Sequence, residues 1–93
     1  MEEWEQDKLF AIAEYLDEEI PDSRATIQPI SPASPVYVLT VRTSKKLYGL
    51  KVNRSLIEAL DVSVGKIKRL MVRDDLARTL EASKGDYTWN PIA

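Results

Sequence analysis

Two runs of alternating apolar residues, separated by only three residues, most constrain what this chain can fold into. Residues 36–43 (VYVLTVRT) and 47–53 (LYGLKVN) are rich in β-branched and aromatic side chains, and Ser-Lys-Lys at 44–46 provides a turn. Because side chains alternate between the two faces of a strand, one face of the pair should be apolar. The residues expected on that face are Tyr37, Leu39, Val41, Tyr48, Leu50 and Val52. The sequence therefore predicts a central antiparallel β-hairpin, in which Gly49 indicates a bulge or a close backbone approach.

An acidic amphipathic helix is predicted over residues 3–20, ahead of the hairpin. Its apolar stripe has the spacing of one helical face, and its members are Leu9, Ile12, Ala13, Leu16 and Ile20. Phe10 and Tyr15 are expected to widen this stripe, and the acidic residues from Glu2 to Asp7 suit the positive end of the helix dipole. Pro21 ends the helix, because proline lacks an N–H and disfavours helical geometry in the residue before it.

The proline-rich segment 22–35 is expected to connect this helix to the sheet. Residues 26–28 can form a short edge strand, where a following proline is tolerated. A docking site for a proline-reading domain is the alternative interpretation. The connector interpretation is favoured, because no PxxP motif with basic flanks is present.

After the hairpin we expect a short helix over residues 54–60, with Asn53 as its N-cap and an apolar patch of Leu56, Ile57 and Leu60. Gly65 is expected at a positive φ. Residues 67–73 are predicted as a third strand. Val64, Ile67, Leu70 and Met71 also fit a helical spacing, but Gly65 interrupts that pattern.

The last third of the chain is predicted to contain a helix over residues 76–83, capped by Asp74 or Asp75 and ended by Gly85. Residues 86–93 are expected to be a tail. Its Tyr87 and Trp89 either pack back on the core, which is the favoured interpretation, or form an exposed contact site.

These elements predict one α+β domain over residues 1–93: an acidic N-terminal helix, a central antiparallel hairpin, a short helix, a third strand and a C-terminal helix. Its parts are a helix in 1–20, a connector in 22–35, a basic hairpin/helix/strand core in 36–73, a helix in 74–83 and a tail in 84–93.

Charge is strongly segregated along a chain whose net charge is only −2. Residues 1–22 contain nine acidic residues and one lysine, for a net charge of −8. Residues 42–73 contain nine basic and two acidic residues, for a net charge of +7. Such asymmetry bears on partners and on pairing within the chain rather than on the fold.

The residue types present argue against catalysis and metal binding. The chain has no histidine and no cysteine, which removes catalytic triads, thiol nucleophiles and the usual zinc ligands. Its three glycines are widely spaced, so no phosphate-binding glycine loop occurs. We therefore expect a protein that is not an enzyme and needs no cofactor. The acidic N-terminus, the absence of long apolar runs and the lack of cysteine favour a cytoplasmic protein with no membrane partner.

The basic segment favours nucleic-acid binding, because several cations that converge on one surface can neutralise phosphates. A two-stranded ribbon also fits the major groove of DNA. The candidate nucleic-acid-binding residues are Arg42, Lys45, Lys46, Lys51, Arg54, Lys66, Lys68 and Arg69. The alternative is a solvated basic face, or one that pairs with the acidic first helix.

The run KVNRSLIEALDVSVGKI at residues 51–67 resembles part of the AbrB/MazE-like swapped-hairpin transcription factors, with the likeness covering about residues 41–73. That family shows a strand, an isoleucine-proline pair, a short leucine-x-x-alanine-leucine helix, a glycine-aspartate turn and a closing strand. Here Val52-Asn53 stands in place of the isoleucine-proline pair, and Gly65-Lys66 in place of the turn. The resemblance implies a homodimer that places Arg42, Lys45, Lys46 and Lys51 on DNA.

A second resemblance is to the double-stranded-RNA-binding domain, through the order helix, short strand, hairpin and helix. The lysine pair that starts the final helix in that family is replaced here by Arg54-Ser55-Leu56. We therefore favour a small dimeric DNA-binding regulatory module. A protein-interaction or adaptor domain is the alternative, which the acidic pI of about 5.1 supports.

Overall fold

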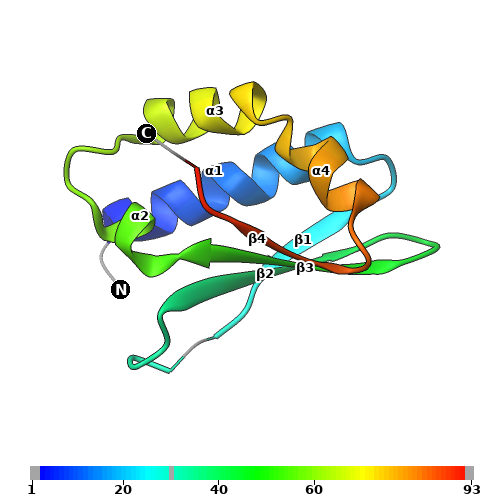
Figure 1. Ribbon diagram of the computed structural model, residues 1–93, viewed down its shortest axis with the longest axis horizontal. Helices are drawn as coiled ribbons and strands as arrows, with labels where there is room; N and C mark the ends of the chain where they lie inside the picture. Colours follow the sequence, from blue (N-terminus) through cyan, green and yellow to red (C-terminus); the bar gives the residue numbers. More distant parts are fainter. Residues whose placement is uncertain (1–2, 30, 92–93) are drawn as a thin grey trace.

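A four-stranded mixed sheet, covered on one face by helices, makes up the fold of this protein in a computed structural model (Figure 1). The structure describes residues 3–29 and 31–91, and the side chains from Glu5 onward. Glu2, which is expected to favour the helix dipole, lies outside the described residues, as do the last two residues of the predicted tail. The elements in chain order are α1 (Glu3–Glu19), β1 (Arg24–Ile27), β2 (Val36–Arg42), β3 (Leu47–Asn53), α2 (Arg54–Glu58), α3 (Val64–Arg73), α4 (Leu76–Ala82) and β4 (Asp86–Trp89). The predicted α+β class is confirmed.

The predicted hairpin forms the centre of the sheet. β2 and β3 pair antiparallel, with Leu39 opposite Leu50 and Tyr37 opposite Val52. All six residues expected on the apolar face are buried beneath the helices. β1 pairs with the outer side of β2, which confirms an edge strand close to the predicted position.

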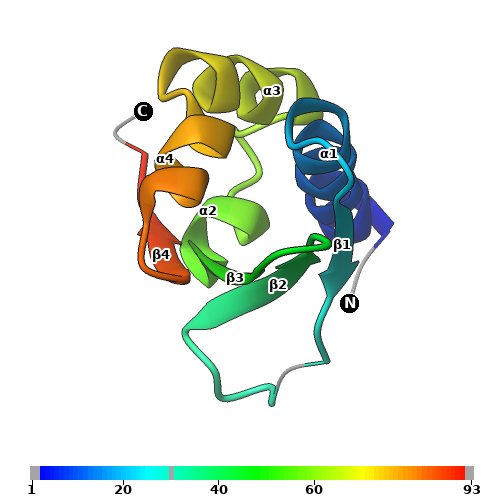
Figure 2. The same ribbon diagram turned by 90° about the vertical axis from the view of Figure 1, so that its right-hand side faces the viewer.

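The N-terminal helix α1 packs its apolar stripe on the sheet as expected. Leu9, Ile12, Leu16 and Ile20 are 0–2% exposed. Phe10 is 55% exposed, so the prediction that it widens this face is wrong, whereas Tyr15 is half-buried against the core. Figure 2 shows α1, α3 and α4 lying together on one side of the sheet, which leaves its other side uncovered.

The segment predicted as a third strand is a helix. α3 begins after Ser63, whose hydroxyl accepts a hydrogen bond from the amide of Lys66 at 3.1 Å. Gly65 lies in the first turn of α3, where backbone N–H groups have no intrahelical partner, so a glycine there costs little and needs no positive φ. The helical spacing of the buried Ile67, Leu70 and Met71 decides the conformation.

The C-terminal tail also differs from expectation, because residues 86–89 form the fourth strand. The chain crosses the helix layer through α2, α3 and α4, and β4 then pairs parallel to β3. Gly49 and Gly85 lie at this contact. The amide of Gly49 donates to the carbonyl of Gly85 at 2.6 Å, and Gly85 has a φ of +127°. The predicted close approach at Gly49 is thus confirmed, and the approaching segment is β4.

The two aromatic residues of this strand pack back on the core, as favoured. Trp89 is 1% exposed, and its indole N–H donates to Asp74 Oδ2 at 3.0 Å. Neither Asp74 nor Asp75 caps α4 through its side chain. Asp75 instead adopts a left-handed conformation with a φ of 47° between α3 and α4.

Asn53 is the N-cap residue of α2, as predicted, but not through its side chain. Asn53 makes no side-chain cap, and its amide donates to Asn90 Oδ1 at 2.7 Å beside the end of β4. Of the predicted apolar patch only Ile57 is fully buried, while Leu60 lies beyond the helix and is 89% exposed.

Acid should weaken the contact between Asp74 and Trp89. The hydrogen bonds from Arg73 and then Trp89 hold the pKa of the Asp74 carboxyl below its usual range. A lowered pKa means that the folded protein binds fewer protons than the unfolded chain, so this stabilisation is lost as the pH falls through the folded-state pKa. At pH 7 we expect Asp74→Asn to be less stable than wild type by roughly 1 kcal/mol.

Urea unfolding followed by tryptophan fluorescence, at pH values from 7 down to 3, measures this difference. The gap between wild type and Asp74→Asn should narrow once the pH falls below about 4, the usual pKa of an aspartate. A gap that stays constant with pH would show that the carboxylate makes no such contribution.

Candidate nucleic-acid interface

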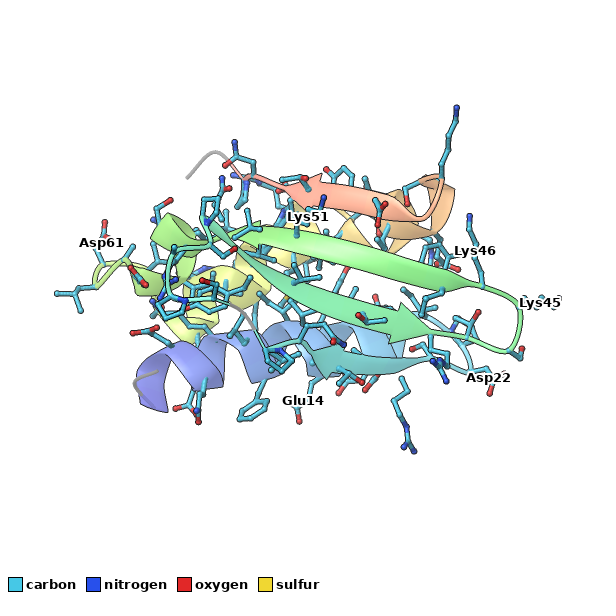
Figure 3. The ribbon with its side chains drawn as sticks, turned by 90° about the horizontal axis from the view of Figure 1, so that it is seen from below. Glu14, Asp22, Lys45, Lys46, Lys51 and Asp61 are labelled. Carbon is cyan, nitrogen blue, oxygen red and sulfur yellow. The ribbon has the colours of Figure 1, made fainter. Side chains whose placement is uncertain are left out.

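One face of the sheet is covered by no helix of the described residues, and we call it the open face. It consists of the outward-facing side chains of the four strands, and Figure 3 looks onto it. These residues are Arg24, Thr26, Val36, Val38, Thr40, Arg42, Leu47, Gly49, Lys51, Asn53, Asp86 and Thr88. Arg24, Arg42 and Lys51 outnumber the single carboxylate of Asp86 on this face, so the open face is basic although the protein is acidic.

Two further cations lie at the β2–β3 turn, which continues the open face at one end (Figure 3). Thr43 orders this turn: its hydroxyl oxygen accepts hydrogen bonds from the amides of Lys45 at 3.2 Å and Lys46 at 2.9 Å. Lys45 projects from the tip of the turn into solvent. Lys46 is held, because its ammonium donates to the Ser83 carbonyl at 3.1 Å and lies 5.0 Å from the ring centre of Tyr48.

Acidic groups are also present near the turn. Asp22 and Glu81 line a hollow of about 460 Å³ together with Lys45 and Lys46. Within the described residues, no two of these four side chains form an ion pair with each other. Glu81 instead pairs with Arg78. A ligand phosphate at the turn would therefore meet the lysines without first displacing a carboxylate from them.

Arg24 is the cation that sequence reasoning missed. It is exposed on β1, directly opposite Arg42 of β2. The sequence predicted an edge strand near this position but not its register, and only the register brings the two arginines together.

Arg54, in contrast, is occupied by contacts within the protein. Its guanidinium pairs with Glu58, donates to the carbonyls of Pro32 at 2.8 Å and Ser34 at 3.2 Å, and lies over the ring of Tyr37. These contacts tie the connector to α2 and β2. We therefore assign Arg54 to the stability of this corner.

The remaining predicted residues lie on the other side of the molecule. Lys68 and Arg69 are exposed on the outer surface of α3, and Lys66 is half-buried in its first turn. α3 belongs to the helix layer, on the side of the sheet opposite to the open face (Figure 1). The predicted site residues therefore do not converge. Arg42, Lys45, Lys46 and Lys51 share one side, and the cations of α3 lie on another.

The helix layer places acidic and basic side chains next to each other. A groove of about 210 Å³ between α1 and α3 is lined by Glu14, Glu18, Lys68 and the 71% exposed Val72, among others. In the part of the chain that the structure describes, Lys68 and Arg69 form no ion pair with these carboxylates. The described ion pairs are local ones: Arg54 with Glu58, Arg73 with Asp74, and Arg78 with Glu81.

Within residues 3–29 and 31–91, no helix is long and apolar enough to cross a membrane, and no group of three or more potential ligands is arranged to hold a metal ion. Comparison of the chain with protein-family profiles, with curated proteins and with solved structures gives no match in any of the three. The resemblance to swapped-hairpin transcription factors is therefore untested as a relationship. Its expected closing strand falls on residues that form α3.

Proposed function

We propose that this protein is a small, non-enzymatic nucleic-acid-binding module that contacts DNA with its open face and its β2–β3 turn. The observation that carries the proposal is the grouping of Arg24, Arg42, Lys45 and Lys51 on one uncovered surface, with none of them in an ion pair within the described residues. Free cations are the groups that gain most from phosphate contacts, because each contact releases condensed counterions.

The shape of this surface also supports the proposal. The β2–β3 ribbon is flanked by β1 and β4 within the sheet, so only its turn at residues 43–46, which Thr43 holds in place and which lies beyond both of these pairings, can enter the major groove. Lys51 lies in the middle of β3 and Lys45 at the tip, so the cations are spread along the ribbon (Figure 3). No aromatic side chain lies on the open face of the described strands, so phosphate contacts rather than base stacking would provide the affinity.

The test is fluorescence anisotropy with a mixed-sequence DNA duplex across a salt series. Wild type should bind more weakly as salt rises, and Lys45→Gln/Lys51→Gln should lower both the affinity and the salt slope. Since each lost phosphate contact reduces the slope by about one, the double variant should lose roughly two units. Lys46 is left unchanged in this variant because its ammonium also anchors the turn to α4.

Lys68→Gln/Arg69→Gln is the matched control, because it removes the same charge from exposed positions on α3. We expect it to bind DNA nearly as well as wild type. Equal losses in the two double variants would show that only total charge matters, and would remove the assignment to the open face.

A protein-interaction module is the second candidate, and the groove between α1 and α3 is the observation that favours it. Exposed Val72 lies there between acidic and basic side chains, a combination that suits a partner of mixed charge. Absence of DNA binding even at low salt would reject the first candidate and leave this one.

A further inference from the structure

A shallow hollow on the open face is lined by side chains of β1 and β2 and of the residue that follows β1. Its volume is about 290 Å³, and its lining residues are Arg24, Thr26, Gln28, Thr40 and Arg42. Every one of these side chains is charged or polar at its end. The hollow therefore has the composition of a site for a polar, negatively charged group.

The register of the two strands brings like charges together in this hollow. Arg24 is directly opposite Arg42, and both are exposed. Directly opposed residues in an antiparallel pair have Cβ atoms only about 4.5–5.5 Å apart, and like charges at such positions destabilise the sheet. Neither arginine forms an ion pair or a side-chain hydrogen bond within the described residues. An anion bound between them would remove this repulsion.

The next pair on the same face of the sheet supplies hydroxyl donors. Thr26 is directly opposite Thr40, and neither hydroxyl is engaged in a hydrogen bond within the described residues. A guanidinium forks onto two oxygens of a phosphate, and hydroxyl and amide N–H groups can donate to the others. A phosphodiester offers two charged non-bridging oxygens to the guanidinium groups and two ester oxygens to the other donors, whereas a carboxylate has two oxygens and no further acceptor. Phosphate is therefore the anion that this hollow fits best.

We propose that the Arg24–Arg42 hollow is a phosphate-binding site, and that it takes one backbone phosphodiester of a nucleic acid. The assignment of the phosphate to a nucleic acid rests on the proposed function, whereas the assignment of a phosphate-binding site does not. No aromatic side chain lines the hollow, so it offers no surface on which a base could stack. Its occupant is thus a phosphate that positions the nucleic acid on the sheet, beside the contacts made by the hairpin.

Titration with sodium phosphate, followed by ¹H–¹⁵N NMR of backbone amides and arginine Nε–H groups, tests the site directly. At constant ionic strength, phosphate should give saturable shifts at residues 24–28 and 40–42, and sodium acetate should not. Arg42→Gln should weaken phosphate binding about tenfold, as expected for loss of one charged hydrogen-bonding partner. This variant should be at least as stable as wild type, because it removes the repulsion between the arginines, so a loss of binding cannot be assigned to unfolding.

Lys68→Gln is the matched control, since it removes one positive charge from the exposed side of α3, outside the open face, and should leave phosphate affinity unchanged. Equal phosphate affinity of Arg42→Gln and wild type would overturn the site. If Arg42→Gln kept the DNA affinity and salt slope of wild type while Lys45→Gln/Lys51→Gln lost both, the phosphodiester assignment would be overturned. The proposed function would stand. Phosphate binding at the hollow without any DNA binding would support the site, reject the proposed function, and indicate a phosphorylated partner of another class.

Discussion

Replacement of Trp89 by alanine should destabilise this protein by about 3–5 kcal/mol, the usual cost of truncating a fully buried large aromatic side chain. Trp89 is 1% exposed and is among the largest fully buried side chains of the core, although it lies only four residues from the end of the chain. The substitution also removes the hydrogen bond from the indole N–H to Asp74. Because small domains are stable by only about 5–15 kcal/mol, much of the folded population could be lost.

Urea unfolding followed by far-UV circular dichroism measures this effect. Trp89→Phe keeps most of the ring volume and should remain folded with a smaller loss, so the variants form a graded series. Thr88→Ala changes the neighbouring residue, whose side chain lies on the open face, and should cost much less. A Trp89→Ala variant as stable as Thr88→Ala would mean that β4 does not belong to the folded core.

Replacement of Lys8 by methionine should cost about 2 kcal/mol or more, because the buried carbonyl of Ile57 would lose its donor and that of Ala59 would keep only the Val62 amide. Lys8 is 3% exposed, and its ammonium donates to the carbonyls of Ile57 at 2.9 Å and Ala59 at 2.7 Å. These carbonyls lie at the C-terminal end of α2, where backbone acceptors have no intrahelical donor. Burial lowers the pKa of the Lys8 ammonium, while the nearby Glu5 and Asp61 carboxylates oppose this shift.

The matched control is Lys84→Met, which makes the same chemical change at an exposed residue between α4 and β4. It should change the free energy of unfolding by no more than about 0.5 kcal/mol. If Lys8→Met and Lys84→Met were equally stable in urea, the ammonium would not be what holds the end of α2 against α1.

A polar network around Tyr37 accompanies Lys8 in this corner of the molecule. The Tyr37 hydroxyl donates to Glu5 Oε2 at 2.9 Å, and Arg54 lies over the Tyr37 ring. Burial, followed by the contact with the Glu5 carboxylate, raises the pKa of Tyr37. This network joins α1, β2 and α2, and it explains why an acidic and a basic residue of the first helix are both buried.

Local patterns in the sequence were sufficient to predict the hairpin and the first helix. Alternation in residues 36–53 and the spacing from Leu9 to Ile20 each determine which side chains are buried, and Pro21 marks where a helix must stop. The predicted third strand is wrong because Gly65 would break the helical pattern only inside a helix, whereas Ser63 as N-cap makes Gly65 a first-turn residue. Position within the helix, rather than residue type, decides the cost of that glycine.

Long-range pairings were less accessible from the sequence. Gly49 signalled that some backbone comes close, but nothing local identifies Gly85 and β4 as the partner. The candidate site shows the same limit. Arg24 joins Arg42 only through strand register, and the change of residues 64–73 from strand to helix moves Lys68 and Arg69 away from the hairpin. Charge along the chain therefore predicted a basic surface but not its extent.

The most direct test of the central claim is to map the binding surface by ¹H–¹⁵N NMR during titration with a mixed-sequence DNA duplex at low salt. We predict that amide shifts concentrate in β1, β2, β3 and the turn at residues 43–46, while the outer residues of α3 stay unchanged. Shifts that concentrate in α1 and α3 instead, with the strands unaffected, would contradict the assignment of nucleic-acid binding to the open face.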